Sequence, residues 1–215
     1  MTSPYGIEGR AAIVTGASRG IGLAVAEALA AAGARVCVTA RDPEGVGRAA
    51  ERVGGIGLAG SVADPAHLRE LTELALREFG RIDVVVNNAA TNQPYGPLMD
   101  ADPDRWREAF TVNVEAPLRL VQCVWRGWTR EHGGAVVNIC TEGAGHVGPH
   151  VGAYGTGSTD SNRTRDTASS TDFRSPPPSA SAHSTSTSPR SIATPGSAYL
   201  PKTTVTGTAR TGPGK

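Results

Sequence analysis

The sequence of 215 residues lacks the features that would assign it to several special classes of protein. It contains no apolar run of about 18 residues, and no basic leader followed by an apolar stretch, so we expect neither membrane insertion nor a signal peptide. Its three cysteines, Cys37, Cys123 and Cys140, are too widely spaced for a disulfide framework or a zinc site. We expect three buried thiols and a reducing, cytoplasmic location.

Charge and composition divide the chain at residue 157. Residues 1–157 carry 14 arginines and 17 acidic residues, whereas residues 158–215 carry 7 basic and 3 acidic residues. Neither part has the basic excess of a nucleic-acid-binding protein, so we expect no nucleic-acid partner. In the second part 31 of 58 residues are Ser, Thr or Pro. This second part therefore has few large apolar side chains, too few to offset the entropy lost on folding. We predict a folded domain over 1–157 and a disordered, low-complexity tail over 158–215.

Apolar runs alternate with helical patterns along the first part. Runs rich in Val, Ile and Ala predict strands at 11–15, 35–39, 56–59, 83–86 and 135–139. Between them, spacings typical of helices occupy 21–32, 44–53, 65–79 and a long segment from Pro103 past Trp125, with Asp64 as an N-cap before Pro65. This alternation predicts an α/β fold with a doubly wound parallel sheet, truncated after its fifth strand.

Two features of this arrangement concern exposed apolar surface. A sheet that ends at 135–139 leaves that strand as an apolar edge, which favours aggregation. Trp106, Trp125 and Trp128 lie on the long helix, where a core face or a helix pairing between subunits accounts for them.

A glycine-rich turn, residues 15–22 with the sequence TGASRGIG, joins the first strand to the first helix. Gly16 permits a tight turn, Gly20 lets the backbone approach a pyrophosphate, and Gly22 allows close helix packing. Because the turn lies between a strand and a helix, dinucleotide binding is favoured over a purely structural turn. The turn predicts a Rossmann-type site whose contacts include Gly16, Ser18, Arg19, Gly20, Ile21 and Gly22.

The residue after the second strand bears on which dinucleotide is bound. Arg41 follows that strand, and Arg19 supplies a second guanidinium from the glycine turn. Guanidinium groups suit the 2′-phosphate of NADP(H), whereas an acid at this place would suit NAD(H), so we expect NADP(H) to be preferred over NAD(H). The alternative is that both arginines are solvated surface charges, since Asp42 adjoins Arg41.

Amides and small residues follow the fourth strand in the segment 87–90, NNAA. A pair of asparagines alone is typical of a turn, but a doubly wound order makes this strand a neighbour of the first. Asn88 and Ala89 are therefore expected to line the same dinucleotide site.

Motifs at 15–22, 87–90, Asn113, 138–141 and Tyr154 follow one another along the chain. The same motifs occur in the same order in the short-chain dehydrogenases/reductases, which the first three quarters of the chain resembles. The resemblance implies hydride transfer between NADP(H) and a small carbonyl or alcohol substrate. It implies a homo-oligomer as well, although the chain lacks the strands that follow the fifth strand in this family, which argues against its formation here. It also implies that Ser61 and Val62 lie at the cofactor.

The resemblance further implies the catalytic groups. Tyr154 corresponds to the proton donor or acceptor at the substrate oxygen, Asn113 to the helix asparagine that holds a relay water, and Thr141 to the assisting serine. A lysine is expected four residues after the tyrosine, where this chain has Ser158. Serine cannot supply the positive charge that lowers the tyrosine pKa, so we expect impaired or absent activity.

The composition changes after Gly157, between Tyr154 and the position of the expected lysine, and this change has two interpretations. A shift of the coding frame near Gly157 is favoured, and a natural tail with a linker or binding role is the alternative. A catalytically silent nucleotide-binding or interaction protein also remains a candidate. We expect no metal site, because the glycine- and proline-rich context of His146 and His150 predicts a loop without further ligands.

Overall fold

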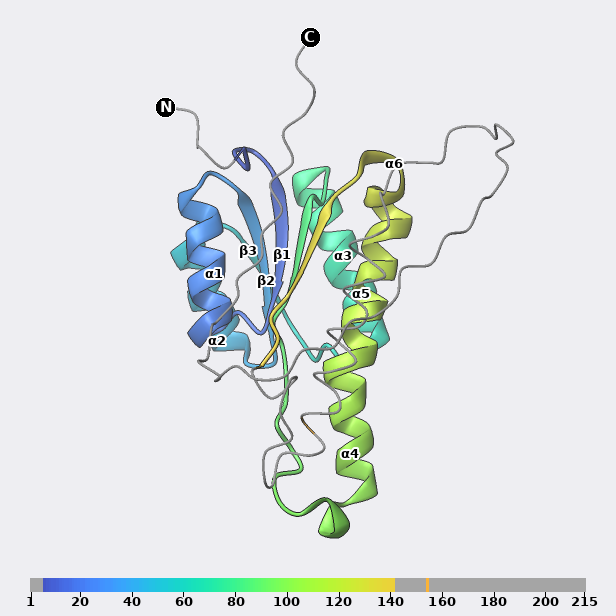
Figure 1. The fold of residues 1–215 in the computed structure, drawn as a ribbon. Helices are drawn as coiled ribbons and strands as arrows, with labels where there is room; N and C mark the ends of the chain where they lie inside the picture. Colours follow the sequence, from blue (N-terminus) through green and yellow to red (C-terminus); the bar gives the residue numbers. More distant parts are fainter. Residues whose placement is uncertain (1–5, 142–153, 155–215) are drawn as a thin grey trace, which may run out of the picture. The chain divides into compact units, whose positions relative to one another are not determined.

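The computed structural model describes residues 6–141 and Tyr154. Five parallel strands form one sheet in the order β3-β2-β1-β4-β5, with helices on both of its faces (Figure 1). The predicted doubly wound α/β fold is thus confirmed for these residues, and the predicted tail at 158–215 lies outside them. The elements are β1 (Ala11–Thr15), α1 (Gly20–Ala31), β2 (Arg35–Ala40), α2 (Pro43–Val53), β3 (Ile56–Ala59), α3 (Pro65–Phe79), β4 (Val84–Asn87), η1 (Leu98–Asp100), α4 (Pro103–Phe110), η2 (Thr111–Glu115), α5 (Ala116–Val124), η3 (Trp125–Thr129), α6 (Arg130–His132) and β5 (Ala135–Asn138).

An Asp-Pro pair begins each of the helices α2, α3 and α4. The carboxylates of Asp42, Asp64 and Asp102 cap these helices by accepting hydrogen bonds of 3.1, 2.8 and 2.8 Å from the N–H groups of Gly45, Ala66 and Asp104. Proline fits the first helical position because its fixed φ is helical and its missing N–H is not needed there. The N-cap predicted at Asp64 is therefore confirmed.

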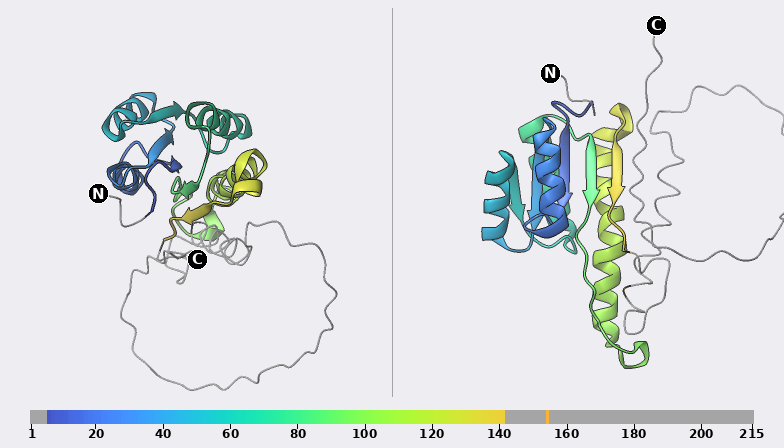
Figure 2. Two further views of the ribbon diagram at one scale, coloured as in Figure 1. Left: turned by 90° about the horizontal axis from the view of Figure 1, so that it is seen from above. Right: turned by 60° about the vertical axis from the view of Figure 1, so that its left-hand side comes forward.

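Alternate residues of each central strand enter two separate cores. Ile13, Cys37 and Val85 pack with apolar side chains of α3 and α5 on one face of the sheet. Their chain neighbours Val14 and Val38 pack with those of α1 and α2 on the other face. Successive side chains of a strand point to opposite faces of the sheet. Figure 2 shows helices on both faces, so the strand side chains on both faces must be apolar.

The long helix predicted from Pro103 runs without a break to His132, through α4, η2, α5, η3 and α6. Figure 1 shows that its α4 end extends past the carboxyl ends of the strands. Two π-helical segments, η2 and η3, were not predicted, because a widened turn leaves no simple spacing in the sequence. In the described part of the chain, no helix is long and apolar enough to span a membrane.

The exposure of the tryptophans on the long helix and of β5 bears on three predictions. Trp106 and Trp125 are 40% and 38% exposed, so a core role is wrong for these two, while pairing between subunits stays a prediction. β5 is the edge of the described sheet and Val137 is 43% exposed, as expected of an apolar edge strand.

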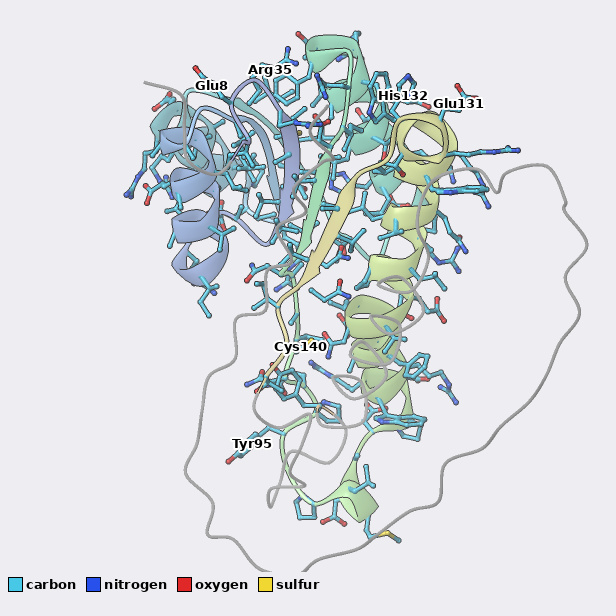
Figure 3. All side chains as sticks on the ribbon, turned by 45° about the horizontal axis from the view of Figure 1, so that its top comes forward. Glu8, Arg35, Tyr95, Glu131, His132 and Cys140 are labelled. Carbon is cyan, nitrogen blue, oxygen red and sulfur yellow. The ribbon has the colours of Figure 1, made fainter. Side chains whose placement is uncertain are left out.

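The expectation of three buried thiols is wrong. Cys37 is buried in the sheet, and this burial raises the pKa of its thiol to about 12. Cys123 is only partly buried, and Cys140, which Figure 3 labels beyond the carboxyl end of β5, is exposed. Cys140 follows β5 at the edge of the described sheet, where side chains are covered less than on a central strand.

Asp83 joins the start of β1 to the segment before β4 at the amino ends of the strands. Its carboxylate accepts hydrogen bonds from Arg10 at 2.9 Å, from the Ala11 N–H at 2.9 Å, and from Arg81 at 2.6 and 2.7 Å. Burial by itself raises the pKa of this carboxyl, but the hydrogen bonds from Arg81, Ala11 and Arg10 outweigh burial and hold the pKa below its ordinary value. The ionised carboxylate therefore stabilises the start of β1.

Replacing Asp83 by Asn is expected to lower the free energy of unfolding by about 1.5 to 3 kcal/mol, because charge-assisted hydrogen bonds are lost in a buried place. The lowered pKa means that this stabilisation is fully present above about pH 3.9, the unfolded value, and is lost as the pH falls through the folded value. Asp83→Asn should therefore also weaken the acid dependence of stability in urea melts at several pH values. Asp100→Asn, at an exposed carboxylate, is the control and should change stability by less than about 0.5 kcal/mol. Equal effects of the two variants would contradict this role.

Candidate functional site

The chemistry-bearing segments gather at the carboxyl edge of the sheet. β1 and β4 are neighbours there, and the order of the strands reverses between them, which is the usual position of a ligand crevice in such sheets. Each strand is followed by a segment singled out from the sequence: the glycine turn after β1, Arg41 after β2, Ser61 and Val62 after β3, Asn88 and Ala89 after β4, and Thr141 after β5.

A group of hydrogen bonds around Thr15 joins the ends of β1 and β4. Thr15 Oγ1 accepts from the N–H groups of Asn88 and Ala89, both at 3.0 Å, and donates to the Val86 carbonyl oxygen at 3.3 Å. In return, Asn88 Nδ2 donates to the carbonyl oxygens of Thr15 and Gly16 at 2.9 and 3.2 Å. These five hydrogen bonds fix the glycine turn against the segment after β4.

The glycines of the turn are required by close approach and by backbone conformation. Gly16 has φ +64°, and a Cβ atom there would lie 2.9 Å from Asn88 Nδ2. A Cβ atom on Gly22 would lie 2.5 Å from the Gly16 carbonyl oxygen, closer than real contacts allow. Gly20 has φ +59° but faces open space, so its backbone is available to a ligand.

The N-terminus of α1 differs from those of α2, α3 and α4. Among the described residues, no side chain caps α1, whereas an aspartate caps each of the other three helices. The first turn of α1, like that of α3, contains no acidic residue. Arg19, at the N-cap position, is extended, and the helix begins at Gly20. The N–H groups of this first turn and the positive end of the helix dipole therefore suit an anion such as a phosphate.

The glycine turn lies against the segment that follows β2. Ala17 donates its N–H to the Thr39 carbonyl oxygen at 3.1 Å, and a Cβ atom on Gly45 would lie 3.0 Å from Ser18 Cβ. Arg41 is exposed beside this contact, whereas Asp42 uses its carboxylate to cap α2 and lies 3.9 Å from Arg48. The Asp42 carboxylate next to Arg41 therefore already accepts a hydrogen bond through Oδ2.

Asn113 connects the long helix to the loop after β4. It is buried within the π-helical segment η2, where its Nδ2 donates to the Thr91 carbonyl oxygen and its Oδ1 accepts from the Thr91 N–H, both at 2.9 Å. The two hydrogen bonds fix the loop that leaves the sheet beside Ala89. Widened turns of this kind commonly occur at functional sites.

Thr141 and Tyr154 are both partly buried, and Tyr154 is helical. The chain neighbours of Tyr154, together with Ser158, His146 and His150, lie outside the described residues. Within the described ranges, no group of three potential metal ligands occurs.

Two polar pairs at this edge were not found from the sequence. Asn87 Nδ2 donates to Asn138 Oδ1 at 2.8 Å and so links the ends of β4 and β5. His67, in the first turn of α3, is buried and lies 2.8 Å from Thr39 Oγ1. Both pairs join residues distant in sequence, and no spacing could reveal them.

The model of the short chain dehydrogenase family matches residues 10–158, which include the glycine turn, Asn88, Asn113 and Tyr154. The chain belongs to this family. The match confirms the resemblance seen in the motifs and covers the whole of the described sheet.

Individual members of the family match over part of their length. The chain is 37% identical over 152 residues to the 3-oxoacyl-acyl-carrier-protein reductase FabG of Escherichia coli strain K12, and this match covers 70% of the chain and 59% of the relative. A metagenomic short-chain oxidoreductase in complex with NADP is 30% identical, with a TM-score of 0.69, over 75% of this chain and 76% of that chain. An NAD+-bound xylitol dehydrogenase is 26% identical, with a TM-score of 0.70, over 75% and 64%. The chain thus spans less than two thirds of the reductase's length.

Gly22→Ala is expected to lower the free energy of unfolding by about 1 to 3 kcal/mol, because its methyl group would meet the Gly16 backbone and Asn88. Gly47→Ala is the matched control, since Gly47 is also helical and a Cβ atom there meets nothing within 4 Å. This variant should raise stability by about 0.5 to 1 kcal/mol. Urea melts followed by circular dichroism measure both changes, and a Gly22→Ala protein as stable as wild type would contradict the close packing.

Proposed function

We propose that this chain binds NADP(H) at the carboxyl edge of its sheet and derives from an oxidoreductase that interconverts small carbonyl and alcohol compounds in the cytoplasm. The observation that carries the proposal is the uncapped N-terminus of α1 behind Gly20, held in place by the Thr15–Asn88 junction. Its unused N–H groups and the open backbone at Gly20 fit a pyrophosphate. The proposed contacts are Gly16, Ser18, Arg19, Gly20, Ile21, Gly22, Arg41, Ser61, Val62, Asn88 and Ala89.

The preference for NADP(H) over NAD(H) rests on the surroundings of Arg41. Arg41 and Arg19 are exposed on adjoining segments, where two guanidinium groups can bind a 2′-phosphate. Asp42 is the carboxylate nearest in sequence, and its helix cap leaves it poorly placed to accept a ribose hydroxyl. Relatives of known structure include one bound to NADP and one bound to NAD+. Family membership therefore leaves the preference open, and it is Arg41 and Arg19 of this chain that favour NADP(H).

The bound nicotinamide would supply or accept the hydride. The Tyr154 hydroxyl would give its proton to the substrate oxygen in reduction and take it back in oxidation, while the Thr141 hydroxyl donates a hydrogen bond to the same oxygen. Asn113 would act through the loop that it holds at Thr91.

Turnover is proposed to be impaired, because Ser158 stands where a lysine would hold the ribose and lower the Tyr154 pKa. The same substitution favours the second candidate, a nucleotide-binding protein without catalysis. In the first case, the Tyr154 hydroxyl still transfers its proton, but without a lysine ammonium beside it, and the transfer is slower.

Oxidation of NADPH with a panel of aldehydes and ketones separates the two candidates. Impaired catalysis predicts slow turnover that Ser158→Lys raises at least about tenfold, since positioned acid/base catalysis contributes roughly 10² to 10⁴ in rate. Tyr154→Phe in the Ser158→Lys background is the control and should abolish the gain. No turnover in the wild type or in Ser158→Lys, with NADPH still bound, would support the silent binding protein.

Arg41→Ala is expected to raise the Kd for NADPH by about tenfold or more, because charge-assisted hydrogen bonds to the 2′-phosphate are lost. The Kd for NADH, which lacks that phosphate, should change by less than about threefold. Arg77→Ala removes the same charge from the last turn of α3, at the opposite end of the sheet, and serves as control. Nucleotide fluorescence titrations measure these constants, and an equal loss for NADH and NADPH would contradict the role of Arg41.

A further inference from the structure

His67 is a buried histidine that the proposed chemistry does not use. It lies in the first turn of α3, three residues after the cap at Asp64, and its side chain is only 6% exposed. Its Nε2 lies 2.8 Å from Oγ1 of Thr39, which is completely buried near the end of β2. This hydrogen bond links α3 directly to the carboxyl end of β2.

The imidazole ring also occupies the space beside Gly60, where β3 has just ended. A Cβ atom on Gly60 would lie 2.5 Å from His67 Cε1, so only glycine lets the ring enter. The Gly60 N–H donates to the Ala40 carbonyl oxygen at 2.9 Å, which ties this turn to the end of β2. One side chain thus contacts the ends of two neighbouring strands.

Thr39 links His67 to the glycine turn. While its hydroxyl meets His67, its carbonyl oxygen accepts the Ala17 N–H at 3.1 Å. The residues that follow these anchored positions are Arg41 after β2 and Ser61 after β3. His67 therefore lies directly behind the groups assigned to the adenosine half of the cofactor, without being among them.

We propose that His67 is a positioning residue for the adenosine half of NADP(H), holding the ends of β2 and β3 against the glycine turn through Thr39 and Gly60. The inference rests on the proposed function, since it concerns the same nucleotide site. Its ligand class is a 2′-phosphorylated adenosine, whose phosphate must reach Arg41 while its adenine lies near Ser61 and Val62.

The ionisation of His67 is consistent with this position. Burial lowers the pKa of the imidazole, and the charges of Glu70 and Asp64 only partly oppose the shift. A neutral ring can donate to or accept from the Thr39 hydroxyl, whereas a charged ring could only donate.

Two substitutions of His67 separate the hydrogen bond from ring packing. His67→Phe fills the same space but leaves the Thr39 hydroxyl without its partner, whereas His67→Gln keeps an amide group that can reach Thr39. Isothermal titration of the full chain with adenosine 2′,5′-bisphosphate, which carries the proposed 2′-phosphate and no nicotinamide, measures the effect. The Kd should rise about three- to tenfold in His67→Phe and stay within about twofold in His67→Gln.

Thr72→Val is the matched control for a loss of stability alone. Thr72 is also buried on α3, and its hydroxyl donates to the Leu68 carbonyl oxygen at 2.8 Å, within the same helix. The variant should lower the melting temperature and leave the Kd unchanged, with all titrations made well below the melting transition. Thr39→Val, which removes the other partner of the same hydrogen bond, should reproduce His67→Phe and replaces it if that variant does not fold.

The outcomes distinguish this inference from the function on which it rests. An unchanged Kd in folded His67→Phe or Thr39→Val, or an equal rise in Thr72→Val, overturns the positioning role while nucleotide binding stands. A folded wild-type chain that binds neither adenosine 2′,5′-bisphosphate nor NADPH overturns the proposed function and the role of His67 with it.

Discussion

The hydrogen bonds between Thr15 and Asn88 are the constraint on which the functional edge of this protein depends. They close the gap between β1 and β4 at the place where the strand order reverses, and they satisfy the backbone groups that the two strand ends would otherwise leave unpaired. The approach is so close that Gly16 and Gly22 cannot carry side chains. As a result, the first turn of α1 is held at a fixed position beside the crevice.

The two ends of the sheet differ in how their polar groups are paired. At the amino ends, Asp83 gathers two arginines and a backbone N–H around one buried carboxylate, and all of its partners belong to the protein. At the carboxyl ends, the described part of α1 has no capping side chain, and Arg41 and Arg19 are exposed. Polar groups that a stable fold would pair are left available there, as expected of a binding site.

Behind this exposed edge, a second layer of buried polar contacts determines where the exposed groups lie. His67 reaches the ends of β2 and β3, Asn113 fixes the loop after β4, and Asn87 pairs with Asn138 across β4 and β5. His67 and Asn113 bring helical side chains to the end of β2 and to the loop after β4, and Asn87 and Asn138 add a side-chain link to a residue pair of the ladder between β4 and β5. The spacing between the segments proposed to hold the cofactor therefore depends on these buried side chains.

The sequence by itself determined the five strands and the main helices of residues 6–141, the cap at Asp64 and the placement of the glycine turn, because these follow from local spacing and from the φ that Gly and Pro permit. It also indicated the family, since the motif residues keep their order along the chain. Only the tertiary structure decided the partners of Asn88, Asn113 and His67, the exposure of Cys140 and Trp106, and the π-helical turn at Asn113. These depend on which side chains the packed sheet and helices bring together across long separations, and local spacing carries no information about such contacts.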